Sequence, residues 1–269
     1  MQYDLVKKTL GTLFSKGPAS RKLFFRILNI LLLRSWYVRR ELKRWSRTMP
    51  GLCHILDAGT GFGQYSYFLS RLSGAYHIKA VDISGDHIND CRRFFKSIGR
   101  THQVDCRTAD LVHFADPQAY DLILCVDVME HIAEDEQVLR NFFLSLREKG
   151  TLILTTPSDK GGSDAHDKDD RSFISEHVRN GYSIAEMQSK LQKAGFREMR
   201  CMYTYGRAGN LAWKLTVKYP VLALHISKSF LLLLPLYYLL TYPICLLLNI
   251  LDITFQQNSG TGLMVKAWK

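Results

Sequence analysis

Apolar and polar positions in the middle of the chain form a repeating order of short apolar runs and longer amphipathic stretches. Runs that are apolar almost throughout are typical of parallel strands covered by helices on both faces, and stretches of period 3.6 are typical of helices. We expect seven strands, at 55–57, 78–84, 102–111, 121–126, 150–157, 197–206 and 262–269. Helices are expected between them, including 133–150, with Gly150 as its C-terminal stop. This order predicts an α/β fold with a doubly wound, mostly parallel sheet.

A charge-free apolar run, Phe230–Leu251, precedes the last expected strand. Its length is close to the roughly 20 residues that cross the core of a bilayer. A buried core helix is the alternative, but a sheet with two helical layers leaves little room for so many leucines. Because the sixth and seventh strands should be neighbours in one sheet, both ends of the run must return to the same side of a membrane. The sequence therefore predicts an apolar helical insertion, monotopic or re-entrant, bent at Pro235 and Pro243.

The segment Arg21–Trp45 combines strong helix formers with recurring basic residues and with the aromatic residues Trp36, Tyr37 and Trp45. A basic amphipathic helix of this kind is typical of the interface of an anionic membrane. Two alternatives remain open: a helix that caps the domain with its basic side chains in water, and a helix that binds nucleic acid. We expect the membrane interface, because the later apolar run independently indicates a bilayer.

The positive charge of the chain is confined to its N-terminal part. The formal net charge is +11, and residues 1–50 hold twelve Lys and Arg residues against two acids, so the remainder is nearly neutral. A neutral body speaks against nucleic acid as a partner. The six cysteines show no CxxC spacing, which fits single thiols in a reducing compartment. We therefore expect a membrane-associated protein whose main domain lies on the cytoplasmic side.

The composition divides the chain into three expected parts. Residues 1–50 are expected to form basic amphipathic helices. Residues 51–206 and 260–269 together should form the α/β domain, and residues 207–259 the apolar, membrane-associating insertion.

The stretch DAGTGFG, Asp57–Gly63, follows the first expected strand and opens a helix. Glycines at such a turn let the backbone approach a ligand, and the helix N-terminus offers unbonded N–H groups. The next two strands end in the acids Asp82 and Asp110, at the edge of the sheet where ligands bind. An acid at the position of Asp82 can bind two ribose hydroxyl groups. The pattern favours a dinucleotide or another nucleotide-like cofactor.

The motifs DAGTGFG, AVDIS, TADL and CVDVMEHI together resemble the successive motifs of class I S-adenosylmethionine-dependent methyltransferases. The resemblance covers roughly residues 39–206 and the last strand. It implies a Rossmann-like methyltransferase domain with S-adenosylmethionine as cofactor. It also implies that the glycine loop holds the methionine part, Asp82 the ribose, and Asp110 with Leu111 the adenine. The implied cofactor-binding set is Asp57, Gly59, Thr60, Gly61, Gly63, Asp82, Asp110, Leu111 and Asp127.

A narrower resemblance concerns the steps MEHI, TTPS and SEHVRNGYSIAEM. They are similar to the ubiquinone-biosynthesis type of O-methyltransferase and its relatives. The chain has no Asp/Asn-Pro-Pro-Tyr step after the fourth strand, where DVME stands instead. This argues against methylation of nucleobase nitrogens and leaves oxygen, other nitrogen and carbon acceptors open.

Methyl transfer requires that the acceptor and the methyl group are held in line and that the acceptor loses its proton. His131 is the expected catalytic base, with Glu130 beside it, and the alternative role of His131 is a hydrogen bond at a helix start. Some relatives that methylate RNA hydroxyl groups bind a divalent metal on a set resembling Asp127, Glu130, His131 and the distant His177. The first position there is usually Glu rather than Asp, and the metal is left open.

The expected function is methylation at a membrane, on an oxygen of a lipophilic or lipid-linked small molecule, with the catalytic domain on the cytoplasmic side. The apolar insertion carries this expectation, because an enzyme that dips into a bilayer can take an acceptor that dissolves there. The alternatives are a non-catalytic membrane adaptor that keeps the fold, and a methyltransferase that acts on protein or RNA.

Overall fold

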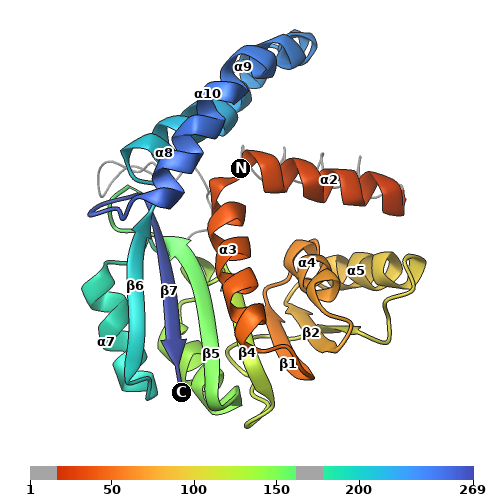
Figure 1. Ribbon diagram of the computed structural model, residues 1–269, viewed down its shortest axis with the longest axis vertical. Helices are drawn as coiled ribbons and strands as arrows, with labels where there is room; N and C mark the ends of the chain where they lie inside the picture. The colour runs from red at the N-terminus through yellow and green to blue at the C-terminus, as the bar shows by residue number, and fades with distance from the viewer. Residues whose placement is uncertain (1–16, 162–177) are drawn as a thin grey trace.

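The computed structural model describes residues 17–161 and 178–269. Its centre is one seven-stranded sheet in the order β3-β2-β1-β4-β5-β7-β6 (Figure 1). All neighbouring strands are parallel except at β7, which is antiparallel to both β5 and β6. The strands are β1 (Cys53–Ala58), β2 (Tyr76–Asp82), β3 (Val104–Thr108), β4 (Tyr120–Val126), β5 (Leu146–Pro157), β6 (Glu198–Thr204) and β7 (Gly262–Trp268). The predicted doubly wound, mostly parallel α/β fold is confirmed.

Helices cover both faces of this sheet. Adjacent strand residues point to opposite faces, so Ile55 lies in one apolar core and Leu56 in the other. The first core is completed by α2 (Pro18–Leu31), α3 (Leu33–Thr48), α4 (Gln64–Leu72) and α5 (Gly85–Ser97). The second is completed by α6 (Asp135–Ser145) and α7 (Ile184–Ala194).

The helix expected at 133–150 is shorter in the structure. α6 ends at Ser145, because Leu146 is already extended (φ −73°, ψ 142°) and begins β5. Tyr120 pairs with Leu146, whereas Leu122 pairs with Thr151, so β5 bulges over the residues between. Gly150 therefore lies within a strand, and its expected role as a helix stop is wrong.

The basic N-terminal segment forms two helices rather than one. Leu32 is extended (φ −97°, ψ 109°) and separates α2 from α3. The apolar side of α3 is buried in the core, where Val38 and Leu42 have no exposed surface. Its basic side chains bind within the domain: Arg39 lies 4.6 Å from the ring centre of Phe68, Arg40 donates to the carbonyl of Ile253, and Arg44 pairs with Glu41. α3 is thus a structural helix of the domain, and it differs from the capping alternative in that these three basic side chains contact the protein.

The apolar insertion is a helical hairpin that projects from the domain (Figure 1). One arm consists of α8 (Arg207–Trp213), a π-helical turn (Lys214–Lys218) and α9 (Tyr219–Ile226). A 3-10 turn (Lys228–Leu232) leads into the other arm, α10 (Leu234–Thr254). Thr204 at the end of β6 pairs with Gly262 at the start of β7, so both arms leave from the same edge of the sheet. The expected adjacency of the sixth and seventh strands is confirmed.

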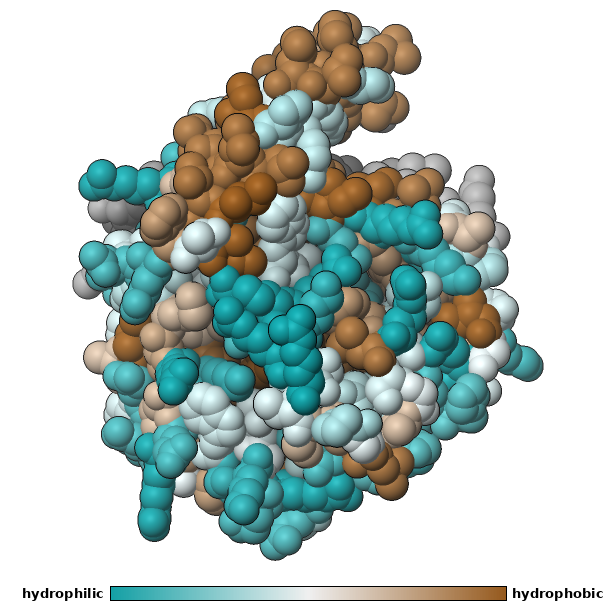
Figure 2. Space-filling view, in the orientation of Figure 1, coloured by the Kyte–Doolittle hydropathy of each residue, from teal (hydrophilic) through white to brown (hydrophobic). Residues whose placement is uncertain are grey.

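The tip of the hairpin exposes an apolar surface to its surroundings (Figure 2). α10 is the one helix in the described ranges that is long and apolar enough to cross a membrane. Leu232, Leu239 and Leu240 are 83%, 71% and 66% exposed. A helix of this hydrophobicity in a soluble core would instead be buried.

Candidate functional site

The glycine loop lies at the carboxyl edge of the sheet, between β1 and α4. Gly59, Gly61 and Gly63 have positive φ angles of 78°, 52° and 78°. A Cβ on Gly59 would come within 2.2 Å of Val128, and one on Gly63 within 3.0 Å of the thiol of Cys91, so both are closely packed. A Cβ on Gly61 would meet nothing within 4 Å. Gly61 therefore presents its backbone to open space, as a loop that holds a ligand should.

Asp57, near the end of β1, is buried beside this loop and binds it by hydrogen bonds. Its carboxylate is only 2% exposed, and Oδ2 accepts hydrogen bonds from Thr60 Oγ1 at 2.8 Å and from Ser66 Oγ at 2.5 Å. Burial raises the pKa of Asp57, and the hydrogen bonds from Ser66 and Thr60 oppose this rise. Asp57 thus fixes the shape of the loop, and Thr60 is oriented by it.

Asp82 joins the end of β2 to the glycine loop. Its Oδ2 accepts from the backbone N–H of Gly61 at 2.9 Å, and its Oδ1 accepts from the backbone N–H of Ser84 at 2.9 Å. Burial raises the pKa of Asp82, but hydrogen bonds from His87, Ser84 and Gly61 outweigh it, so the net pKa is lower than the ordinary value. The carboxylate is ionised at neutral pH, and each oxygen retains acceptor capacity for a hydroxyl group.

Asp110 and Leu111 follow β3 at the same edge. Asp110 Oδ1 accepts from the backbone N–H of Val112 at 2.9 Å, which forms a tight turn. The side chain of Leu111 is 5% exposed and packs in the second core, and Asn141 donates to its carbonyl at 2.9 Å. Both residues thus have rigid positions, one polar and one apolar.

Asp127 follows β4 with a positive φ of 51°, a conformation that Asp tolerates better than most residues. Its backbone N–H donates to the carbonyl of Thr155 at 2.9 Å, and its Oδ1 accepts from Thr155 Oγ1 at 3.1 Å. Its Oδ2 pairs with the guanidinium group of Arg34, from the first turn of α3. The backbone N–H of Arg34 in turn donates to the hydroxyl group of Tyr205 at 2.8 Å, beyond the end of β6.

Arg34 and Tyr205 are site residues that the sequence did not indicate. They stand 171 positions apart, and no motif connects them. The positive φ of Tyr205, 55°, is a property of the folded chain and has no counterpart in the sequence. Together with Asp127 they close the edge of the sheet where the hairpin begins.

Glu130 and His131 lie on a short 3-10 turn, Met129–His131. Glu130 is 1% exposed, and its Oε2 accepts from Thr156 Oγ1 at 3.2 Å. His131 is exposed. The geometry gives Glu130 the position of a supporting residue and leaves His131 accessible to an acceptor.

The described members of the candidate metal set do not come together as a metal site. His177 lies outside the described residues, Asp127 pairs with Arg34, and Glu130 is buried against Thr156. Within residues 17–161 and 178–269, no three His, Cys, Asp or Glu side chains come together as a metal site requires. The described side chains therefore offer no metal centre.

The helix α2 lies across the glycine loop. The guanidinium group of Arg21 donates to the carbonyls of Phe62 at 2.6 Å and Asp90 at 3.0 Å. Gln64, the first residue of α4, donates to Asn29 Oδ1 at 2.8 Å. These contacts were not predicted, because the Arg and Asn residues of an amphipathic helix normally face water.

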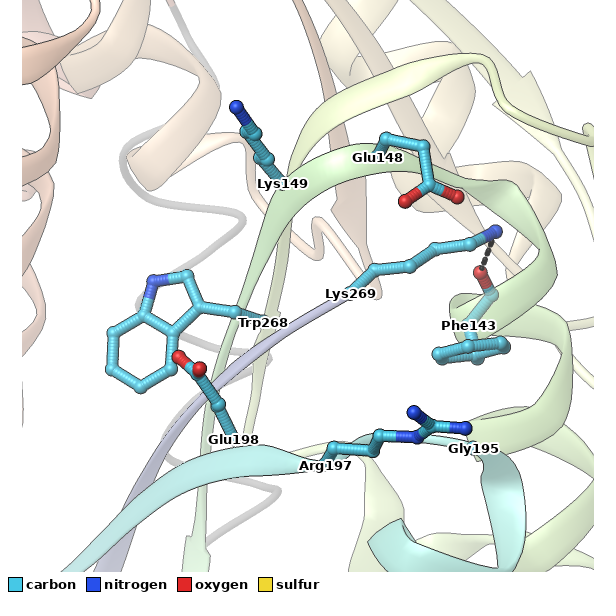
Figure 3. A pocket seen from close by; sticks show the side chains of 8 residues that line it. All are labelled: Phe143, Glu148, Lys149, Gly195, Arg197, Glu198, Trp268 and Lys269. Carbon is cyan, nitrogen blue, oxygen red and sulfur yellow. Dashed lines mark hydrogen bonds between the residues drawn. The ribbon is translucent and has the colours of Figure 1, made fainter.

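A cavity of about 820 Å³ lies at the opposite, amino edge of the sheet (Figure 3). Its lining mixes Trp268 and Phe143 with side chains of both charges, and Lys269 Nζ donates to the carbonyl of Phe143 at 2.8 Å. Ligands of open parallel sheets bind at the carboxyl edge. This cavity is therefore separate from the candidate site.

Comparison with known proteins identifies the domain. A family model described as a methyltransferase domain matches residues 55–150. The ubiquinone biosynthesis O-methyltransferase of Xanthomonas campestris pv. campestris is 28% identical over 110 residues, which are 40% of this chain and 44% of that protein. The chain thus aligns with less than half the length of this curated relative.

Solved structures agree on the fold. The phosphoethanolamine N-methyltransferase 2 of Haemonchus contortus, in complex with S-adenosyl-L-methionine, superimposes with a TM-score of 0.64 at 14% identity, over 94% of this chain and 57% of that one. A sarcosine dimethylglycine methyltransferase of Galdieria sulphuraria gives 0.60 at 15% identity, over 87% and 85%. The family predicted from the sequence agrees with the methyltransferase match over residues 55–150, and these structures confirm the predicted fold. Residues 55–150 therefore carry the methyltransferase domain, in a chain that folds as a class I S-adenosylmethionine-dependent methyltransferase.

Proposed function

We propose that this chain methylates an oxygen atom of a lipophilic small molecule at the surface of a membrane. One observation carries the proposal: both arms of the apolar hairpin leave the sheet at its carboxyl edge, which is the edge where ligands of such sheets bind. Asp82 ends β2 and Asp127 follows β4 at this edge, and β6 and β7 connect to the hairpin there. An acceptor dissolved in the bilayer would thus be close to the cofactor.

The residues of the glycine loop fit S-adenosylmethionine. When bound, this cofactor supplies an electrophilic methyl group on a sulfonium with a good leaving group. Gly61 faces open space with its backbone, and the ionised Asp82 would accept hydrogen bonds from two ribose hydroxyl groups. Asp110 and Leu111 would hold the adenine between a polar and an apolar contact. Asp57 and Thr60 shape the loop, with Gly59 and Gly63 packed behind it.

His131 is the proposed base that takes the proton of the acceptor hydroxyl. Its exposure at the carboxyl edge supports this role, and Glu130, buried behind it, holds the turn in place. Asp127, fixed by Thr155 and Arg34, would border the reacting groups. A positioned base of this kind contributes roughly 10²–10⁴-fold to the rate.

The interior of the hairpin supports a place in the bilayer. Pro220 has no N–H, so it cannot donate to the carbonyl of Thr216 or of Leu215, four and five residues before it. The hydroxyl groups of Tyr237 and Tyr238 on α10 donate to these two carbonyls, at 2.7 and 2.8 Å. Backbone polar groups in hydrocarbon must be bonded within the protein. The two tyrosine hydroxyl groups meet this requirement next to Pro220, where a helical N–H donor is missing.

The class of acceptor follows from the hairpin and from the relatives. Several curated relatives are named as ubiquinone biosynthesis O-methyltransferases, which supports an oxygen acceptor on a lipophilic ring. The free cysteines of the described residues are in keeping with the cytoplasmic face, where thiols stay reduced.

The proposal is tested by following a labelled methyl group. The full chain in vesicles is incubated with labelled S-adenosylmethionine and a panel of hydroxylated polyprenyl quinols and water-soluble catechols. We expect label in the lipophilic products. The His131→Gln chain should bind the cofactor normally but transfer the label at least about 10²-fold more slowly. Transfer to the water-soluble acceptors alone, or equal transfer by both chains, would contradict the lipophilic acceptor or the base, respectively.

A further inference from the structure

The two sides of α2 have different environments. Its inner side is anchored on the glycine loop: Arg21 is 7% exposed, and Phe24 packs edge-to-face on Phe62 at 5.7 Å between ring centres. Phe25 is 1% exposed and touches Tyr67 of α4 and Phe94 of α5. The position of α2 is therefore coupled to the conformation of the loop that would hold the cofactor.

The outer side of α2 is an exposed stripe at helical spacing, formed by Ala19, Leu23, Arg26 and Ile30. Leu23 is 50% exposed and Ile30 is 47% exposed, although each could have been polar without loss of core packing. Residues four, three and four positions apart share one face of a helix. Two large apolar side chains on either side of an Arg are typical of a helix that lies in the headgroup layer of a membrane.

The hairpin connects this stripe with the bilayer. The hydroxyl group of Tyr242 on α10 donates to the carbonyl of Ile30 at 3.4 Å, so the C-terminal end of α2 touches the hairpin. Figure 1 shows α2 across the ends of α4 and α5, on the side of the molecule from which the hairpin projects. A bilayer that takes up the hairpin would meet α2 next. Arg26 makes anionic phospholipid the complementary surface.

We propose that the outer stripe of α2 binds the surface of an anionic bilayer and that this contact tightens cofactor binding at the glycine loop. The inference rests on the proposed function. A bilayer that orders α2 from outside stabilises the same helix that Arg21 and Asn29 fasten to the loop. Cofactor binding then costs less conformational entropy, because the loop is already ordered. Such coupling is reciprocal, so the cofactor must strengthen membrane binding by the same factor.

The test compares S-adenosylhomocysteine binding by the full chain in three settings: detergent, vesicles of phosphatidylcholine, and vesicles of phosphatidylcholine with phosphatidylglycerol. Binding to the wild-type chain should be about fivefold tighter or more in anionic than in neutral vesicles. The double variant Leu23→Ser, Ile30→Ser and the single variant Arg26→Gln should lose this gain and keep the detergent affinity. Leu144→Ser, which alters a leucine on α6 that is 52% exposed, should keep the gain.

A reciprocal measurement separates coupling from a change in folding. Saturating S-adenosylhomocysteine should raise the partition of the wild-type chain onto anionic vesicles by the factor seen in ligand binding, and leave the double variant unchanged. Equal affinity in both kinds of vesicle, or a gain that survives in the double variant, would overturn the inference. Absence of ligand binding in every setting would refute the methyltransferase itself, and absence of vesicle association would refute its place at a membrane.

Discussion

The hydroxyl group of Tyr37 donates a hydrogen bond to Oδ1 of Asp252 at 2.7 Å, and both side chains are buried. Asp252 lies near the end of α10, and its Oδ2 accepts from the backbone N–H of Gly209 in α8 at 3.0 Å. Burial, with Asp252 as neighbour, raises the pKa of Tyr37, so its hydroxyl group remains a donor. One carboxylate thus fastens both arms of the hairpin to α3 and through it to the sheet.

Removing this hydroxyl group should loosen the hairpin and destabilise the fold. Tyr37→Phe deletes the single O–H donor that lies within reach of both Oδ1 and the carbonyl oxygen of Asp252, and it leaves a buried carboxylate short of one partner. We expect the free energy of unfolding in urea, measured in detergent, to fall by about 1–3 kcal/mol. Tyr67→Phe is the matched control, since in the described part of the chain the Tyr67 hydroxyl group makes no hydrogen bond. Equal losses for both variants would contradict the role of the Tyr37–Asp252 pair.

The openness of Gly61 predicts a separation of binding from stability. A Cβ there meets no protein atom within 4 Å, but it would occupy the open space where we propose that the cofactor binds. Gly61→Ala should cost only about 1–2 kcal/mol of stability, from its positive φ, while S-adenosylhomocysteine affinity falls by a larger free energy. Gly74→Ala, also open but without a positive φ, serves as control in the same calorimetric titration. Unchanged affinity in Gly61→Ala would mean that the ligand does not approach this loop.

Asp82 predicts a particular dependence of stability on pH. Its pKa is lower in the folded chain than the ordinary value of ~3.9, because hydrogen bonds from His87, Ser84 and Gly61 outweigh the effect of burial. A lowered pKa stabilises the fold above the ordinary pKa, and this stabilisation is lost as pH falls through the folded pKa. The difference in unfolding free energy between wild type and Asp82→Asn should therefore be present at about pH 5 and shrink below about pH 4. Urea unfolding at several pH values measures it, and a difference that vanishes near neutral pH would refute this assignment.

The exposed leucines of the hairpin predict its partition into lipid. Replacing Leu232 and Leu239 by Gln removes two side chains that are 83% and 71% exposed in the structure and would lie in hydrocarbon. Each inserted leucine contributes about 1.5–3 kcal/mol, so vesicle binding should weaken by roughly 10²-fold or more. Leu52→Gln, at a leucine 64% exposed before β1, should bind vesicles like the wild type in the same flotation assay. Similar binding by all three chains would mean that the hairpin stays outside the bilayer.

Much of the fold could be predicted because its signals are local. The apolar runs predicted each strand. Asp82 ends β2 as expected, and Asp110 lies two residues beyond the end of β3 rather than within it, at the carboxyl edge that parallel strands share. The hairpin followed from a topological constraint: an insertion between neighbouring strands must return to its starting edge.

The rest could not be predicted because it depends on contacts between distant segments. The break at Leu32 lies in a run of leucines with no Pro or Gly to mark it, and packing of α3 on the sheet decides it. The Arg34–Asp127 pair and the Tyr37–Asp252 bond connect helices to positions far away in the sequence. The basic residues of α3 suggested a membrane-binding helix for the same reason, because the sequence does not reveal their partners within the protein.

The most direct measurement is a calorimetric titration of S-adenosylmethionine into the detergent-purified full chain and into its Asp82→Ala variant. We expect micromolar binding with one site in the wild-type chain, and its loss in the folded variant, because Asp82 orders the glycine loop through Gly61 and would accept from the ribose. A folded wild-type chain that binds no S-adenosylmethionine would refute the proposed methyltransferase and leave a membrane adaptor with a methyltransferase fold.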